Sequence, residues 1–457
     1  MRHKLYRGWQ MLRATFPLLV FVCGALALAL YRCPDEKGYW PIALIALGLS
    51  VLVSRRPAQS AQHAIEGMSD QLVSVMVCAW LLAATLGQFL REAGLVPFLA
   101  TALHDSPPGV FLAGVFLISS VVATGTGTAV GTILLVTPVL FPLGATVGAD
   151  PHFLLGAVLA GGAFGDDYSP LSDTTIASAN TQGVSISNAV KDRLKYVLPP
   201  AALALVGYLL FGGLTRNTSQ AAEPASINAV AFLMLVPPAI VVGLCFARLH
   251  ILASLLAGIV SAVVLGMITG IVPPQRVLSF DPDALTAKSI LIDGMSRGVG
   301  ISVFSILLMG IVGVARHRLA ASMHSSASSD GLSKAKAEAL IMAVTIGANA
   351  VLAHNTVTIL ATQDIASRLR RRSNLAPLRV SQIVDLSANT IMHMLPYMVT
   401  VIIAVAAASK DVGLYGLSSI NPVRAGLLNL HSLGLFMMLL VVIGSGLWRG
   451  SSDMPSE

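Results

Sequence analysis

Charged residues are scarce in this 457-residue chain. Asp, Glu, Lys and Arg make up 11% of it, whereas hydrophobic residues make up 55%, and a soluble domain carries roughly a quarter charged residues. No polar tract long enough for a soluble domain stands between the apolar runs. The chain therefore has too little polar surface to face water on all sides, and its composition predicts an all-α polytopic membrane protein.

Cysteines are few, and alternating strand patterns are missing. The four cysteines show no metal-ligand spacing, so no cysteine-based metal site is expected. The net charge of +7 does not indicate nucleic acid, because basic residues collect in the cytoplasmic loops of membrane proteins. Placing the basic segment 1–13 inside puts most Lys and Arg on the same side, including the run 368–372. This predicts a bacterial-type inner membrane protein with a cytoplasmic N-terminus.

Apolar runs recur from end to end. We expect about 12–14 membrane segments, some shorter than the ~20 residues of a full crossing. They lie near residues 14–31, 40–53, 72–90, 109–123, 128–148, 152–180, 195–212, 229–247, 250–271, 298–314, 338–353, 356–367, 380–408 and 429–447. Segments 152–180 and 380–408 are interrupted by polar residues and proline, which predicts broken helices.

A weak internal repeat relates the two halves. The sequence Glu66-Gly67-Met68-Ser69 recurs as Asp293-Gly294-Met295-Ser296, and Pro170 and Pro396 fall at nearly the same offset. The predicted topology runs the spans after the two motifs in opposite directions, as in transporters built from inverted repeats. We therefore divide the chain into N-terminal spans (1–60), a first repeat (61–215), connecting spans (216–290) and a second repeat (291–450).

The first interrupted segment concentrates oxygen-bearing side chains. A charge at the bilayer centre costs at least ~3 kcal/mol, so such residues pair, bind ions or carry protons. Carboxylates and hydroxyls suit a small hard cation, and a carboxylate can hold a proton instead. The candidate cation and proton ligands here are Asp166, Asp167, Ser169, Ser172, Asp173 and Thr174. The alternative is an ordinary hydrophilic loop between two spans.

Further polar residues line up in matching places of the two halves. A cluster before each break, with Thr126 and Thr132 in one half, marks the tip of a re-entrant hairpin, although small residues there also suit tight helix packing. The second half supplies His354, Asn355, Thr358, Asp385, Asn389 and His393. His393 falls opposite Asp167 in the repeat, and a hydrogen-bonded buried histidine is the other interpretation of it.

The segment from Gly165-Asp166 through Ser169-Pro170-Leu171-Ser172-Asp173-Thr174-Thr175 resembles the signature of the NhaC-type sodium/proton antiporter family. The likeness extends over about ninety residues. It implies inverted repeats with paired hairpins and broken helices, and exchange of sodium for protons at Asp166 and Asp173, with Ser169, Ser172 and Thr174 nearby. Asp167 and Tyr397-Met398 depart from the family pattern, and relatives of this family also carry organic acids or amino acids.

Other functions compete with this expectation. Coupled movement of a small organic acid or amino acid is a close rival, with Arg297 as a counter-charge or as a snorkelling interfacial residue. An intramembrane aspartyl protease would use Gly165-Asp166, but a second Tyr-Asp element is absent. The expected partners are the lipid bilayer and monovalent cations, with Na⁺ and H⁺ as transported ions, no cofactor and no enzymatic activity. A homodimer is compatible with the sequence, but no segment marks an interface.

Overall fold

The structure is a computed structural model. It describes residues 16–28, 31, 36–54, 56–103, 105–213, 229–247, 249–282, 286–323, 332–409, 411–417 and 419–449. The basic segment 1–13, used above to orient the chain, lies outside these ranges.

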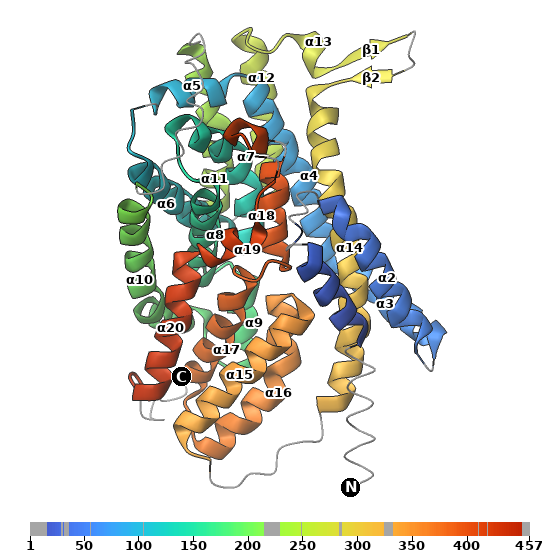
Figure 1. The fold of residues 1–457 in the computed structure, drawn as a ribbon, viewed down its shortest axis with the longest axis vertical. Coiled ribbons are helices and arrows are strands. Elements are labelled where there is room, and N and C mark those ends of the chain that lie inside the picture. The colour runs from blue at the N-terminus through green and yellow to red at the C-terminus, as the bar shows by residue number, and fades with distance from the viewer. Residues whose placement is uncertain are drawn as a thin grey trace.

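The described chain is a bundle of helices (Figure 1). After a helix over Phe16–Leu28, the first half contains η1 (Glu36–Gly38), α2 (Tyr39–Leu52), α3 (Pro57–Met68), α4 (Gln71–Glu92), α5 (Leu95–Ala102), α6 (Pro108–Thr126), α7 (Ala129–Val147), α8 (Pro151–Tyr168), α9 (Asp173–Gln182) and α10 (Ile186–Phe211). A connecting region follows with η2 (Ala229–Leu235), α11 (Val236–Phe246), α12 (Ile251–Ile268) and α13 (Pro274–Val277).

The second half begins after a short antiparallel hairpin. Strands β1 (Ser279–Asp281) and β2 (Thr286–Lys288) pair with Phe280 opposite Ala287, a local departure from helix that the sequence analysis does not anticipate. The helices that follow are α14 (Ile290–Met323), α15 (Lys334–Leu352), α16 (Asn355–Ser373), α17 (Pro377–Met392), α18 (Val399–Ser409), η3 (Val412–Tyr415), α19 (Pro422–Leu427) and α20 (Leu430–Ser445).

Many of these helices are long and apolar enough to span a membrane. Among the described residues, seven helices are long and apolar enough to cross a membrane, and five shorter apolar helices accompany them. Large apolar side chains on their outer surfaces are exposed, such as Leu203 on α10 and Val260 on α12, as expected for surfaces that face lipid instead of water. The predicted all-α polytopic fold is confirmed.

Helix boundaries in the two halves match when residue numbers are shifted by one constant amount. Moving along the chain by 226 residues takes the start of α7 at 129 to the start of α16 at 355, and the end of α7 at 147 to the end of α16 at 373. The same shift relates both ends of α6 to those of α15, and the starts of α8 and α9 to those of α17 and α18. The repeat therefore extends well beyond the short matching motifs.

The related elements occupy opposite ends of the molecule. In Figure 1 the hairpin of α6 and α7 lies in the upper half, and the hairpin of α15 and α16 lies in the lower half. The broken helices also run in opposite directions. Along the chain, the first one passes from α8 in the upper half of Figure 1 to α9 in the lower half, whereas the second passes from α17 in the lower half to α18 in the upper half. This is the arrangement expected of inverted copies. The exact repeat limits, 61–215 and 291–450, stay predictions.

The repeated glycine motif joins the two halves. A Cβ on Gly67 of α3 would lie 2.2 Å from the carbonyl oxygen of Met309 on α14, and one on Gly294 of α14 would lie 2.5 Å from the Cα of Thr85 on α4. In both motifs the glycine permits close backbone approach to a helix of the other half. The motif is thus a packing device between the halves.

Two short helices and one helix start were not predicted. Helix α3 reads PAQSAQHAIEGM and contains no long apolar run, and α5 has only 8 residues. Helix α10 begins at Ile186, nine residues before the predicted start at 195, because its first turns are polar. Hydropathy locates lipid-facing segments and therefore misses helices that are polar on one side.

Candidate functional site

Four residues, 169–172, interrupt the first broken helix between α8 and α9. The Ser169 hydroxyl donates to the backbone oxygen of Thr124 at 2.8 Å, and Leu171 N donates to the Ser169 hydroxyl at 3.2 Å. These bonds satisfy the Leu171 N–H in the break and the Thr124 carbonyl in the last turn of α6, as burial at membrane depth requires. Asp173 stands in the first turn of α9, where a helix N-terminus stabilises negative charge.

The tip of the α6–α7 hairpin packs directly against this break. Gly127 ends α6 with a φ of 68°, and a Cβ there would lie 2.7 Å from the Leu171 Cβ. Glycine is required at this position by both its left-handed backbone and its close contact. The hydroxyls of Thr126 and Thr132 lie 3.3 Å apart at the tip, and Thr132 also donates to the Thr128 backbone oxygen at 2.9 Å.

The second half repeats this construction with different side chains. Ala353 ends α15 with a φ of 50°, and His354 then has a φ of −152°, against −153° for Thr128 in the first half. The Tyr397 hydroxyl ties the second break to the backbone oxygen of Ala350 at 2.8 Å. Ala350 is the counterpart of Thr124 at the shift of 226 residues, so both breaks are held at equivalent points.

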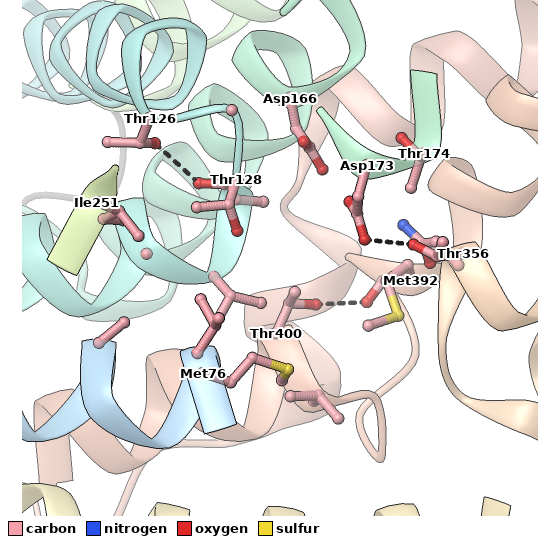
Figure 2. Close-up of a pocket in the computed structure, with 18 of the residues that line it drawn as sticks. Met76, Thr126, Thr128, Asp166, Asp173, Thr174, Ile251, Thr356, Met392 and Thr400 are labelled. Carbon is pink, nitrogen blue, oxygen red and sulfur yellow. Dashed lines mark hydrogen bonds between the residues drawn. The ribbon is translucent and has the colours of Figure 1, made fainter. Parts of the chain in front are cut away.

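A hydrogen bond between two residues of the cavity wall connects the two halves. The Thr356 hydroxyl, on the first turn of α16, donates to the Asp173 carboxylate at 2.5 Å (Figure 2). Asp166, at the end of α8, projects toward the same space in Figure 2. One oxygen of its buried carboxylate has no partner in the described part of the chain. Asp166 is therefore available to a cation or a proton.

A cavity of about 220 Å³ lies between the breaks and the hairpin tips (Figure 2). Its polar wall includes seven of the predicted site residues: Thr126, Asp166, Asp173, Thr174, His354, Asn355 and His393. Its apolar wall is supplied by α4, α12, the first break and the start of α18, through Met76, Trp80, Ile251, Leu171 and Val399. No lysine or arginine is among its lining residues.

The other predicted residues lie outside the cavity wall. Ser172 donates to or accepts from Thr174 at 2.9 Å, and the buried Thr358 donates to Asn349 at 3.1 Å. Ser169 and Thr132 hold the break and the tip, as described above. Three more belong to a polar network behind the wall: Asp167, Asp385 and Asn389.

This network surrounds a guanidinium group that is fully buried. Arg193 of α10 forms an ion pair with Asp385 at 2.5 Å, and both side chains are 0% exposed. It also donates to the backbone oxygen of Asp167 at 2.9 Å and to the Thr175 hydroxyl at 2.7 Å. Asn389 donates to Asp167 at 2.6 Å and to Asp385 at 3.1 Å. The network joins α8, α9, α10 and α17.

Arg193 corrects the sequence interpretation. Lys191, Arg193 and Lys195 form a basic stretch that the positive-inside rule assigns to a cytoplasmic loop, but Arg193 is buried among polar groups of both halves. A basic residue just before an apolar run is also typical of a loop that precedes a membrane span. The sequence therefore gives no signal that Arg193 is buried. Trp80 and Met76 were likewise not predicted, because they stand in the continuous apolar run of α4. Arg297 lines a separate cavity of about 50 Å³ with Gln88 and Arg91.

Comparisons with known proteins confirm the resemblance to the NhaC-type family. A model of the Na⁺/H⁺ antiporter family matches residues 16–213. The Na⁺/H⁺ antiporter NhaC of Alkalihalophilus pseudofirmus is 25% identical over 42% of this chain and 41% of its own length. The malate-2H⁺/Na⁺-lactate antiporter of Bacillus subtilis is 29% identical over 38% and 37%. The chain thus spans about two fifths of the length of these curated relatives.

One solved structure covers nearly the whole chain. The Alcanivorax borkumensis YdaH transporter covers 95% of this chain and 99% of its own, with a TM-score of 0.43 and 14% sequence identity.

Proposed function

We propose that this chain is a secondary antiporter that exchanges sodium for protons by alternating access at Asp166 and Asp173. The observation that carries the proposal is the position of Asp173, which lines the cavity while accepting a hydrogen bond from Thr356 of the other half. A carboxylate between two inverted halves changes its surroundings when those halves move. The matched relatives are named as antiporters, which supports a transporter instead of a protease.

The chemistry of exchange follows from the polar wall. Carboxylate and hydroxyl oxygens from Asp166, Asp173 and Thr174 are suitable ligands for a small hard cation. When no cation is bound, a carboxylate oxygen can hold a proton instead, so the same two side chains can serve either ion. A site that holds either sodium or protons, and is exposed alternately to each side, produces antiport.

Alternating access requires elements that can move as units. The site lies where both helices are broken and where both hairpin tips end, so each half contributes one hairpin and one break (Figure 1). In transporters of this construction one repeat rocks against the other around a central site. A bacterial inner membrane, a cytoplasmic N-terminus and a homodimer remain predictions that accompany this function.

A second candidate function is favoured by the size and lining of the cavity. A volume of about 220 Å³ far exceeds the ~30 Å³ that one water occupies in the liquid, and apolar side chains form much of its wall. A small organic solute fits such a space. Among the described residues, two aspartates and no lysine or arginine line the cavity, so an amine or amino acid suits it better than a dicarboxylate does.

Proteoliposomes test both functions together. The purified chain is reconstituted with a proton gradient and a pH-sensitive dye, and Na⁺, Li⁺, K⁺, small carboxylates and amino acids are then added in turn. We expect sodium to collapse the gradient without any organic solute. A response only to an organic solute would transfer the proposal to the second function, and silence with every solute would contradict both.

A further inference from the structure

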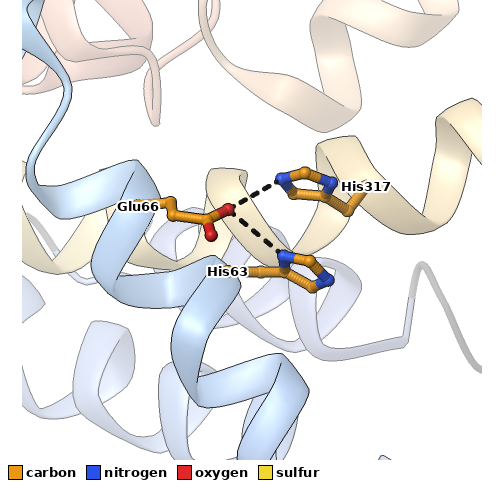
Figure 3. Close-up of side chains that lie close together, drawn as sticks. All are labelled: His63, Glu66 and His317. Carbon is orange, nitrogen blue, oxygen red and sulfur yellow. Dashed lines mark hydrogen bonds and ion pairs between the residues drawn. The ribbon is translucent and has the colours of Figure 1, made fainter.

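Two histidines and a glutamate meet outside the central cavity, on a surface that the proposed exchange does not use. His63 and Glu66 project from α3 and His317 from α14 (Figure 3). The Glu66 Oε2 atom lies 3.3 Å from His63 Nδ1 and 3.2 Å from His317 Nε2. One ligand atom from each of the three residues lies within 4.8 Å of the others.

Tight helix packing fixes the backbones that present these side chains. His63 and Glu66 are three residues apart and therefore share a helix face. A Cβ on Gly313 of α14 would lie 2.4 Å from the backbone oxygen of His63, and one on Gly67 would lie 2.2 Å from the backbone oxygen of Met309. The two helices thus touch through their glycines directly beside the cluster. Its backbone spacing is set by rigid elements and not by loops.

The spacing of the ligand atoms agrees with tetrahedral metal coordination. Bonds of about 2.0–2.1 Å to imidazole nitrogen and carboxylate oxygen place neighbouring tetrahedral ligands about 3.3 Å apart. Both distances from the Glu66 oxygen have this value within 0.2 Å. We propose that His63, Glu66 and His317 bind a divalent transition-metal ion of the zinc type, with water completing the coordination.

The ligand types select the class of ion. Neutral imidazole suits zinc, copper and nickel, whereas calcium and magnesium prefer sites made of oxygen alone. Two imidazoles and one carboxylate leave a fourth tetrahedral position open. This ion is therefore not the transported sodium, and the inference does not depend on the proposed exchange.

Metal binding requires the two rings to turn. They are stacked with centroids 3.8 Å apart and planes 18° apart, so their nitrogen lone pairs run side by side instead of converging. The side chains are 22% exposed for His63, 46% for His317 and 48% for Glu66, which leaves room for rotation and an entry path for the ion. The bound ion then ties α3 of the first half to α14 of the second.

Zinc titration of the intact chain tests the site. The chain is purified in detergent without a histidine tag, and zinc is titrated in competition with a chromogenic chelator. We expect one saturable zinc per chain at this site. Its affinity should fall at least about 10–100-fold in His63→Gln, His317→Gln and Glu66→Gln, because even residues that only hydrogen-bond to metal ligands contribute this much. Cobalt replaces zinc as a spectroscopic probe, and its visible absorption should be lost in the same variants.

A matched histidine provides the control. His250 is exposed and caps α12 because its Nδ1 atom accepts from Leu252 N, and His250→Asn supplies a capping oxygen in place of that nitrogen. This variant should bind zinc like the unchanged chain. The proposal is overturned if the unchanged chain shows no saturable binding, if the three variants bind zinc with unchanged affinity, or if His250→Asn loses as much affinity as they do. Glu66→Gln, which keeps the side-chain shape, decides the matter if a histidine variant fails to fold.

Discussion

The three aspartates on either side of the first break have different surroundings. Asp166 and Asp173 line the cavity, whereas Asp167 is 0% exposed and accepts from Asn389 behind the cavity wall. The sequence places all three in one polar cluster and offers no means to separate them. The difference arises from helical geometry, since consecutive residues near the end of α8 project in different directions. The proposed ion exchange therefore uses Asp166 and Asp173, whereas Asp167 belongs to the network behind the cavity wall.

Arg193 provides a residue-scale prediction about stability. Replacing it with Met removes the partner of the buried Asp385 carboxylate, and breaking a buried ion pair costs about 3–5 kcal/mol. We expect Arg193→Met to lower the thermal unfolding temperature of the detergent-purified chain strongly. Arg193→Met combined with Asp385→Asn should recover part of the loss, because no unpaired charge is then buried. Equal stability of Arg193→Met and the unchanged chain would contradict the role assigned to this ion pair.

The capping aspartate of α8 gives a pH-dependent prediction. Asp150 accepts from His152 N at 2.8 Å and from Phe153 N at 3.1 Å. Burial raises the pKa of Asp150, but its hydrogen bonds with His152 and Phe153 outweigh that effect and hold the pKa below its ordinary value of 3.8. The ionised cap therefore stabilises the fold above that value, and this contribution is lost as the pH falls through the lower pKa of the folded state.

Asp150→Ala measures the contribution of this cap. Loss of a capping side chain costs about 1 kcal/mol, so the variant should unfold at a lower temperature than the unchanged chain at pH 7. The difference should shrink below about pH 4, whereas Asp150→Asn, which retains a capping oxygen, should be nearly neutral at pH 7. A difference for Asp150→Ala that grows on acidification would contradict this account.

At the scale of elements, the sequence predicts the breaks better than it predicts their partners. Pro170 and Pro396 mark both interruptions, and the apolar runs locate most of the spanning helices. The partners cannot be read in the same way, because Asn389 and Asp167 are 222 residues apart along the chain and Thr356 and Asp173 are 183 apart. Only the fold decides which polar residues meet. The seven predicted residues in the cavity wall were found because their polarity interrupts apolar runs.

The glycines between helices supply a matched pair of element-scale variants. Gly67→Ala would place a methyl group against the backbone of α14, and overpacking of this kind typically costs about 1–3 kcal/mol. Gly347, inside α15, has nothing within 4 Å of an added Cβ, so Gly347→Ala should be neutral or stabilising. Thermal unfolding in detergent should therefore separate the two variants. Similar unfolding temperatures would show that α3 and α14 are not held at this contact.

At the scale of the whole molecule, the two halves share one construction and differ in chemistry. Helix boundaries and the backbone at the hairpin tips repeat at the shift of 226 residues. The carboxylates of the cavity wall, however, come from the first half alone, and the second half supplies Thr356, His354 and Asn355. In the proposed mechanism these two similar units move against each other, and the unequal side chains give one charged site between them.

Asp173 is the residue on which the proposed exchange depends most directly, so sodium-driven proton movement in proteoliposomes should be compared between the unchanged chain and Asp173→Asn. The substitution removes the charge while keeping the shape and an oxygen that can accept from Thr356. We predict that it abolishes exchange, while thermal unfolding stays close to that of the unchanged chain and Asp105→Asn, a change away from the cavity wall, exchanges normally. Full sodium-dependent exchange by Asp173→Asn would contradict the assignment of this cavity as the transport site.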